Sequence, residues 1–457
     1  MDQPELTSVG AKLDLKRTVP WIVFVVFFAV LNETVFNVST PAIAHQFALT
    51  PSGVGWVMSS FIVFFGIGSV IYGRLSDIFS LKRLIVIGIL VYSAGSVIGF
   101  ALQSSYPAVI AARAIQGAGA SAIPALITVV VARYFPVSER GKVFGFITST
   151  VAFAIGVGPV IGGFVSGTFH WSFLFVVPLF TLIAIPFFRK VLPDEPRREG
   201  KIDILGAGLV AGGVGSLILY LSFLRWYFLV ASLALLAGFV VDILTHRSPF
   251  IEPGMFRNAM FRKRVIVGFI LFSVVTGVLF VIPLMLSAID GLTTSQIGLV
   301  LFPGALSAVV FGTIGGNLAD KRGNTFVITV GLALLLASYL LLSVVVGYSP
   351  WFVAASLVLT YIGFSLAQTA LVNSVSQILQ PHETGVGMGL FNLVSFVSAA
   401  VGTALVGRYL GSGWTGFWHN PLVAESKAFP YSNLLTIFAL FVVLAGVVYW
   451  GSRRKRL

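Results

Sequence analysis

Long apolar stretches alternate with short polar connections along almost the whole chain. Each stretch is close to 20 residues long, which is the length an α-helix needs to cross the hydrocarbon core of a bilayer. The short alternating segments of a transmembrane barrel do not occur in the sequence. The pattern predicts fourteen spanning helices, over residues 19–42, 53–73, 84–103, 106–131, 143–166, 171–188, 204–223, 226–245, 265–288, 296–318, 325–346, 350–377, 386–410 and 433–451.

Composition supports this fold class and narrows the function. Hydrophobic residues make up 57% of the 457 residues and charged residues 10%, which is typical of a membrane protein. The net charge of +13 would suggest nucleic acid in a soluble protein, but in a membrane protein Lys and Arg mark cytoplasmic loops. We therefore expect no nucleic-acid partner. The chain has no Cys and its five His show no metal-ligand spacing, so we expect neither a metal site nor a cofactor.

The basic residues also predict the orientation of the chain. Only Arg225, Arg408 and Lys427 fall in connections on one side. On the other side, basic residues collect around 12–17, 74–83, 133–142, 189–201, 247–264, 321–322 and 453–456. Because positive loops stay inside, both termini are predicted to be cytoplasmic, as an even number of spans requires. We expect a multi-pass protein of the cytoplasmic (inner) membrane.

A short loop motif occurs twice. GRLSDIFSLKR (Gly73–Arg83) follows the second predicted span, and GNLADKRG (Gly316–Gly323) follows the tenth. A parallel internal repeat of this kind is typical of transporters built from two helix bundles. If each bundle has six helices, the seventh and eighth spans form an insert. The predicted domains are therefore a first six-helix bundle, a linker with two inserted helices, and a second six-helix bundle, over residues 1–190, 191–250 and 251–457.

Three further stretches, taken with the two loop motifs, carry a family resemblance. They are LNETVFNVSTP (Leu31–Pro41), RAIQGAGA (Arg113–Ala120) and GVGPVIGG (Gly156–Gly163). These resemble the first-span, fourth-span and fifth-span antiporter motifs of the major facilitator superfamily, specifically its fourteen-span drug:proton antiporters. The resemblance covers the whole chain. It implies an all-α integral membrane protein with the major facilitator fold, in which two six-helix bundles and two extra helices give 14 transmembrane helices.

Within that group the chain most resembles the tetracycline exporters of Gram-positive bacteria, which share the pair Asn32–Glu33. Two departures stand out. Those exporters have a carboxylate immediately before GVGP and another in the thirteenth span, where this chain has Ile155 and Ala399. The two missing acids speak against a tetracycline–metal substrate.

Glu33 is the most informative single residue, because a carboxylate within a membrane span is costly and usually functional. Glu33 and Arg113 lie roughly 13 Å and 10 Å from the outer ends of their predicted helices, hence at similar depths. The resemblance implies that these two spans are neighbours, so the side chains can meet. Burial favours the neutral carboxyl and a nearby cation favours the charged form, which suits an acid that binds and releases a proton. A static buried ion pair is the alternative.

Other polar residues fall within predicted spans. Asn37 and Gln116 are candidates for the substrate or proton path, while Gln368, Asn373 and Asn392 are weaker ones. Each of them could line a cavity or form a hydrogen bond between helices, and the sequence leaves both readings open.

Asp77 and Asp320 occupy the same position in the two loop motifs. Either residue alone would be read as a solvated loop residue. The resemblance implies that such acids form a conformational latch on the cytoplasmic side, with Arg74, Lys82 and Arg83 as candidate partners. Ser80 stands where the motif usually has Gly.

The fifth-span motif contains Gly156, Gly158, Pro159, Gly162 and Gly163. Its glycines allow close approach between helices and its proline can kink the span. Ordinary close packing explains the same residues. The antiporter reading adds only that the kinked helix rocks between two states.

Together these features predict a proton-coupled efflux antiporter that exports a drug or a small amphipathic metabolite by alternating access. Its partners would be the small-molecule substrate, protons and membrane lipids, with Na⁺ or K⁺ left open as coupling ions, and we expect a monomer. No catalytic constellation is evident, so an enzyme is not expected. The alternatives are a proton- or cation-coupled uptake symporter and a non-transporting membrane protein.

Overall fold

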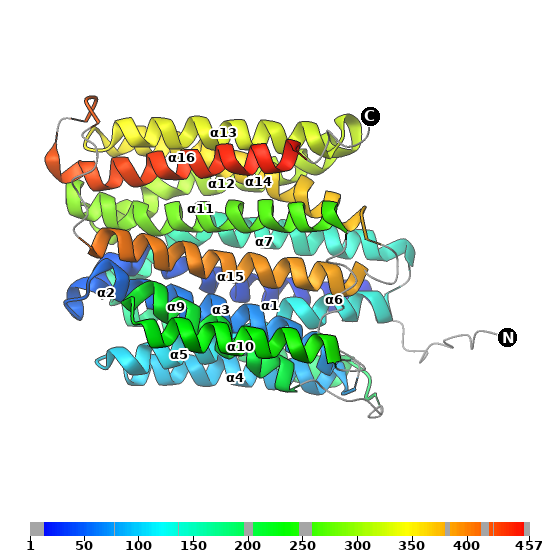
Figure 1. Ribbon diagram of the computed structural model, residues 1–457. Coiled ribbons are helices and arrows are strands. Elements are labelled where there is room, and N and C mark those ends of the chain that lie inside the picture. The colour runs from blue at the N-terminus through cyan, green and yellow to red at the C-terminus, as the bar shows by residue number, and fades with distance from the viewer. Residues whose placement is uncertain are drawn as a thin grey trace.

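Every regular element in the described part of the chain is a helix (Figure 1). The computed structural model describes residues 13–76, 78–135, 137–195, 204–245, 258–379, 384–412, 420–423 and 425–451. The elements are α1 (Leu15–Val35), η1 (Asn37–Ser39), α2 (Thr40–Gln46), α3 (Pro51–Leu75), α4 (Leu81–Ala101), α5 (Tyr106–Ala120), α6 (Ala122–Tyr134), α7 (Val137–Thr168), η2 (Trp171–Phe175), η3 (Val177–Ala184), α8 (Ile185–Val191), α9 (Ile204–Phe223), α10 (Trp226–Thr245), α11 (Ala259–Asp290), α12 (Thr294–Arg322), α13 (Asn324–Val345), α14 (Pro350–Ser376), α15 (Thr384–Gly411), η5 (Ser426–Ala428) and α16 (Phe429–Trp450).

The helices have the length and composition of membrane spans. Within the described residues, 12 helices are long and apolar enough to cross a bilayer, and two shorter apolar helices cover Phe153–Thr168 and Gly208–Leu221. Each predicted span coincides with one of these helices. The protein is therefore an all-helical, multi-pass membrane protein.

The helices pack as two groups, α1–α8 and α11–α16, referred to below as the first half and the second half. The halves meet along two seams, α7 against α12 and α3 against α15. The start of α1 lies beside the end of α6, and the start of α11 beside the end of α16. Both junctions lie on the right in Figure 1, and this end of the bundle is called the terminal end. The opposite end, where α2 lies, is the far end.

The first predicted span is continuous in space but broken in its hydrogen bonding. The α-helix stops at Val35, passes through the 3₁₀ turn η1, and resumes as α2, where Pro41 occupies the first turn. Because proline lacks an N–H and is best tolerated in a first turn, the sequence NVSTP explains the restart. The break places η1 against α7, α11 and α12.

The predicted span at 171–188 is helical but is largely not an α-helix. It consists of η2 and η3, both 3₁₀ helices, followed by the short helix α8. Pro178 and Pro186 lie in the first turns of η3 and α8. Hydropathy located this span correctly, and the two prolines mark the starts of its second and third helical pieces.

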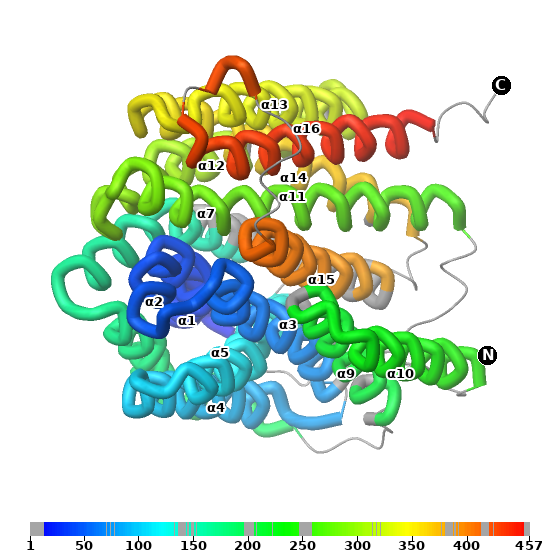
Figure 2. Tube along the Cα trace, turned by 60° about the vertical axis from the view of Figure 1, so that its left-hand side comes forward, coloured from blue at the N-terminus to red at the C-terminus, as the bar shows by residue number. Residues whose placement is uncertain are grey.

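Helices α9 and α10 form a hairpin outside both halves. In Figure 2 they lie beside α3 and α15, and α9 contacts both of those helices. Trp56 of α3 stacks on Phe223 of α9 with ring centroids 6.3 Å apart. Asp242 of α10 is only 8% exposed. The hairpin therefore covers the α3–α15 seam.

Candidate ion-coupling site

Glu33 lies in the last turn of α1, just before the break at η1, and is partly buried. Arg113 is the charged group that acts electrostatically on its carboxylate. Among the described residues, however, no ion pair within 4.0 Å joins the two side chains. The structure thus brings together the two residues that the sequence paired by depth, but as neighbours and not as a closed salt bridge.

Arg113 of α5 is completely buried. Its guanidinium carbon lies 4.2 Å from the ring centroids of both Phe36 and Phe61, so two aromatic faces hold the charge. Its Nε donates a hydrogen bond to the carbonyl oxygen of Val57 at 3.1 Å, and its Nη1 donates one to Gln116 at 3.0 Å. Within the described structure Nη2 has no hydrogen-bond partner. One donor of a buried cation is therefore available to a water, an anion or a substrate.

Gln116 extends this network to α4. Its Nε2 donates to Ser96 Oγ at 2.8 Å, and Ser96 Oγ donates to the Tyr92 carbonyl at 3.0 Å. The Tyr92 hydroxyl donates to the Phe28 carbonyl at 3.1 Å. The amide of Gln116 therefore supports Arg113 and ties α5 to α4, and α4 to α1. The sequence named Gln116 but gave no signal for Ser96 or Tyr92.

Asn32 and Asn37 differ in their placement. Asn32 is fully buried beside the Tyr92 hydroxyl, with which its amide interacts. A buried amide is stable only with such a partner. Asn37 lies instead on η1, where its carbonyl accepts from Thr40 Oγ1 at 2.9 Å and the turn faces the second half. The two asparagines of the first-span motif therefore lie in different environments: Asn32 is buried in α1, and Asn37 lies where η1 contacts the second half.

The three weaker candidates, Gln368, Asn373 and Asn392, also differ in their surroundings. Asn373 Nδ2 donates to Asn324 Oδ1 at 2.9 Å, where α14 ends and α13 begins, which is a structural role near the terminal end. Gln368 lies on α14, partly buried. The side chain of Asn392 lies outside the described residues.

The glycines of the fifth-span motif sit on α7, with Pro159 inside the helix. A side chain at Gly158 or Gly162 would overlap α1, at Thr34 or Val35. A side chain at Gly163 would overlap the backbone of α12 at Thr294 and Gly298. The motif therefore lets one helix approach Glu33's own helix and the opposite half at once.

A charged network at the terminal end was not foreseen from the sequence. Glu195, in the linker after α8, accepts from Arg133 Nη1 at 3.2 Å and from the backbone N–H of Leu81 at 3.3 Å. Arg133 Nη2 donates to the Ser76 carbonyl at 3.0 Å. Glu195 therefore sits at the positive N-terminus of α4 and, through Arg133, holds the loop that carries the first loop motif.

Lys82 belongs to the same surface. Its Nζ lies 2.8 Å from Asp194 Oδ2, and this hydrogen bond lowers the pKa of the Asp194 carboxyl. Lys82 therefore pairs with an acid in the linker that follows α8. Arg83 is exposed. Asp77 lies outside the described residues, as do the side chains of Arg74 and Asp320, so the latch predicted for them stays a prediction.

Residues 22–403 match the sequence profile of the Major Facilitator Superfamily. The chain belongs to this superfamily. It is accordingly a secondary transporter of the superfamily and not an enzyme, which confirms that prediction and removes a non-transporting protein from the alternatives.

Relatives of this superfamily transporter resemble it over most of their length. An uncharacterized MFS-type transporter, YcnB, of Bacillus subtilis (strain 168) is 26% identical, covering 94% of this chain and 93% of its own. The riboflavin transporter RibZ of Clostridioides difficile (strain 630) is 24% identical, covering 86% and 89%. These bacterial relatives are consistent with a cell-membrane protein.

Solved structures show the fold. A bacterial homolog of the human lysosomal transporter Spinster, in an inward-facing and occupied conformation, aligns with a TM-score of 0.67 at 13% identity, covering 96% of this chain and 97% of that one. A D-xylose–proton symporter aligns with a TM-score of 0.63 at 16% identity, covering 94% and 96%. This transporter therefore has the major facilitator fold.

Proposed function

We propose that this transporter is a proton-coupled efflux antiporter that exports a drug or a small amphipathic metabolite by alternating access. The observation that carries the proposal is the arrangement of Glu33 and Arg113. A lone acid in the last turn of α1 lies within the field of a cation that is fully buried between Phe36 and Phe61. Because Glu33 and Arg113 do not form a salt bridge, the Glu33 carboxylate can bind or release a proton without breaking one.

The coupling follows from two effects on the Glu33 carboxylate: burial, which favours its neutral form, and the charge of Arg113, which favours its ionised form. Contact with water on the outer side lets the carboxylate take up a proton, and closure around it favours the neutral form. Opening towards the cytoplasm, with Arg113 nearby, favours release. One proton crossing 100 mV supplies about 2.3 kcal/mol, which supports a substrate gradient of roughly fortyfold. Asn37 and Gln116 complete the proposed path, Asn37 at the contact between the halves and Gln116 as the support of Arg113.

Alternating access requires the two seams to open and close. The α7–α12 seam approaches closely at Gly163 and Thr294, and the α3–α15 seam at Gly407 and Pro51, both towards the far end. These contacts support a state closed at the far end. In the proposed arrangement fourteen helices span the inner membrane of a monomer, with both termini cytoplasmic and domains at 1–190, 191–250 and 251–457.

The latch is a separate part of the proposal. Asp77 and Asp320, with Arg74, Lys82 and Arg83, would control the balance of conformations at the terminal end. The Arg133–Ser76 hydrogen bond supports it, because it fixes the backbone next to Asp77. Asp77→Asn should then slow transport while substrate affinity changes by no more than a few fold. A large loss of affinity with unchanged conformational populations, from spin-label distances across that face, would contradict the latch.

The proposed substrate is neutral or singly charged. A metal–drug complex carries positive charge into the cavity, and desolvating that charge is costly unless carboxylates face it. Ile155 on α7 and Ala399 on α15 supply none. The riboflavin transporter among the relatives keeps an uncharged aromatic heterocycle within the candidate class.

The relative named as a riboflavin transporter also keeps an uptake symporter as the second candidate. The direction of proton movement separates the two. An antiporter moves protons in the direction opposite to the substrate, whereas a symporter moves both in the same direction.

The experiment is reconstitution into liposomes with an imposed pH gradient. The panel is tetracycline with and without Mg²⁺, a lipophilic cation, and riboflavin, with Glu33→Gln as the matched uncoupled control. We expect gradient-driven antiport of a neutral or singly charged compound with weak dependence on Mg²⁺. Symport would overturn the proposed direction, and strong Mg²⁺-dependent tetracycline transport would overturn the proposed substrate class.

A further inference from the structure

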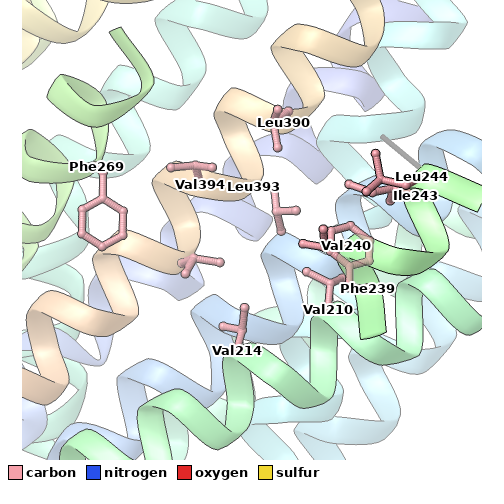
Figure 3. Close-up of a pocket in the computed structure, with 11 residues that line it drawn as sticks. Val210, Val214, Phe239, Val240, Ile243, Leu244, Phe269, Leu390, Leu393 and Val394 are labelled. Atoms are coloured by element: carbon pink, nitrogen blue, oxygen red, sulfur yellow. The ribbon is translucent and has the colours of Figure 1, made fainter. Parts of the chain in front are cut away.

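A cavity of about 500 Å³ lies between the α9–α10 hairpin and the second half (Figure 3). Its described lining consists only of Val, Leu, Ile and Phe side chains, contributed by α9, α10, α11 and α15. Figure 3 shows Leu390, Leu393 and Val394 along α15, with Phe239 and Val240 of α10 on one side of that helix and Phe269 of α11 on the other. The cavity is separate from the Glu33–Arg113 site.

The position of the cavity along the bundle is set by its helices. It is lined by the last two turns of α10, by Phe269 in the N-terminal part of α11, and by residues 390–397, which reach from the N-terminal part of α15 to its middle. It therefore lies towards the terminal end. Leu390 and Val397 are seven residues apart, which corresponds to roughly 10 Å along α15. The lining residues Val240 and Leu244 are 49% and 65% exposed, so the cavity opens at the surface of the protein, towards the hydrocarbon of the membrane.

The chemistry of the lining restricts the occupant. An apolar cavity offers water no hydrogen bonds and stays dry. An empty cavity forfeits packing in proportion to its volume. The volume lies within the range of cavities that hold drug-sized ligands, about 300–1,000 Å³. Of the groups present in the membrane at this depth, a flexible acyl chain fits such a lining.

A basic side chain lies at the level where the head group of such a lipid would be. Arg262 precedes Phe269 by seven residues, which places both on the same face of α11 with Arg262 roughly 10 Å nearer the terminal end. Arg262 is exposed and, like its two neighbours, also has a contact within the protein; Lys263 Nζ bonds to the Gly451 carbonyl and Arg264 lies over the ring of Tyr449. Asp242 of α10 does not line the cavity. An anionic phosphate is therefore complementary to this rim.

We propose that this cavity binds an acyl chain of an anionic phospholipid from the leaflet at the terminal end, with the phosphate at the level of Arg262. The site holds the α9–α10 hairpin against α15. Because α9 also contacts α3, the lipid occupies the outside of a seam that joins the two halves.

The test is photolabelling in nanodiscs of phosphatidylglycerol and phosphatidylethanolamine, each supplied in turn with a diazirine on its acyl chain. Labelled peptides are mapped by mass spectrometry. We expect phosphatidylglycerol to label the lining of α10 and α15 more strongly than the lipid-facing surface of α16. Val240→Trp, which fills the mouth of the cavity, should lower that labelling to the level of the α16 surface. The matched control is Val443→Trp on α16, since Val240 and Val443 are 49% and 45% exposed.

Arg262→Gln provides an independent readout that does not change the apolar lining. It should abolish the difference between phosphatidylglycerol and phosphatidylethanolamine while labelling persists. Unchanged labelling in Val240→Trp would overturn the site. Equal labelling by the two lipids in the unaltered protein would overturn the anionic head group. Displacement of the label by tetracycline, riboflavin or a lipophilic cation would overturn a structural lipid site, because it would show that the cavity is a substrate site that lipid enters only in the absence of substrate.

Discussion

The interiors of the two halves are held together by different chemistry. In the first half, Arg113 is fully buried and its hydrogen bonds connect α5 to α3, with Gln116 continuing to α4. At a corresponding place in the second half, Ser338 Oγ donates to the Ser356 carbonyl and shares a hydrogen bond with Thr360 Oγ1, both at 2.6 Å. Within the described part of the second half no charged side chain is fully buried.

This difference indicates where ion coupling resides. Hydroxyl groups can join helices without carrying charge, whereas a buried cation needs a partner and responds to one that changes protonation. Among the described residues, the two halves therefore share similar helix packing, but only the first half contains a fully buried charged side chain. Under the proposed function, the first half couples the proton and the second half follows through the α7–α12 and α3–α15 seams.

The largest effect is expected when Glu33, the acid of the first half, is replaced. Glu33→Gln should abolish gradient-driven export while substrate exchange without a gradient survives at least in part, because the amide imitates a permanently protonated carboxyl. The measurement is transport into proteoliposomes with and without a pH gradient. Full pH-driven transport by the purified variant would remove Glu33 from the mechanism.

The next largest effect is expected at the cation. Arg113→Lys keeps the charge but cannot retain both the Val57 and Gln116 hydrogen bonds and the planar stacking between Phe36 and Phe61. A charge-assisted hydrogen bond is worth about 1.5–3 kcal/mol, so transport should slow by about tenfold or more. Its pH dependence should shift as well. An unaltered rate in a folded variant would mean that the charge matters and its geometry does not.

A smaller effect is expected at the terminal end. Glu195→Gln removes a carboxylate whose side chain is 6% exposed between Arg133 and the start of α4. Transport should slow several-fold with little change in KM, since the loop is displaced and the substrate site is not. A change in KM alone, with kcat unchanged, would be inconsistent with this role.

Asp194→Asn is the matched control, because the Asp194 side chain is 73% exposed and an exposed ion pair contributes little. Since Lys82 lowers the pKa of Asp194, whatever the pair contributes is present above the ordinary carboxyl range and is lost as pH falls through the lowered pKa. Near neutral pH the variant should transport at close to the normal rate.

The smallest effect is expected in the second half. Thr360→Val removes one hydroxyl from the Ser338 network, which should lower the free energy of unfolding by about 0.5–1.5 kcal/mol. The ratio of gradient-driven to exchange transport should stay the same. It is checked by thermal unfolding beside the two transport assays. Loss of coupling in this variant would erase the distinction between the halves.

Several residues of the candidate site can be identified from the sequence. Glu33 and Arg113 were placed at similar depths because a helix converts residue number into distance along the membrane normal, and the family resemblance implied that their spans are neighbours. Gln116 was named as a polar residue in a span, but its bond to Arg113 depended on which face α5 turns to α4. Ser96, Tyr92 and the Phe36–Phe61 sandwich gave no signal, because serines and aromatics are common in spans for ordinary packing.

The sequence alone determined which segments are apolar and long enough to span a membrane. It also showed that the loop motif occurs twice. These follow locally, since each span must satisfy its own backbone and face lipid. Tertiary structure decided the rest. It placed Glu195 on the N-terminus of α4, left one nitrogen of Arg113 without a hydrogen-bond partner among the described residues, and laid the α9–α10 hairpin over one seam. Those outcomes depend on how helices distant in sequence orient their faces, which neither hydropathy nor spacing specifies.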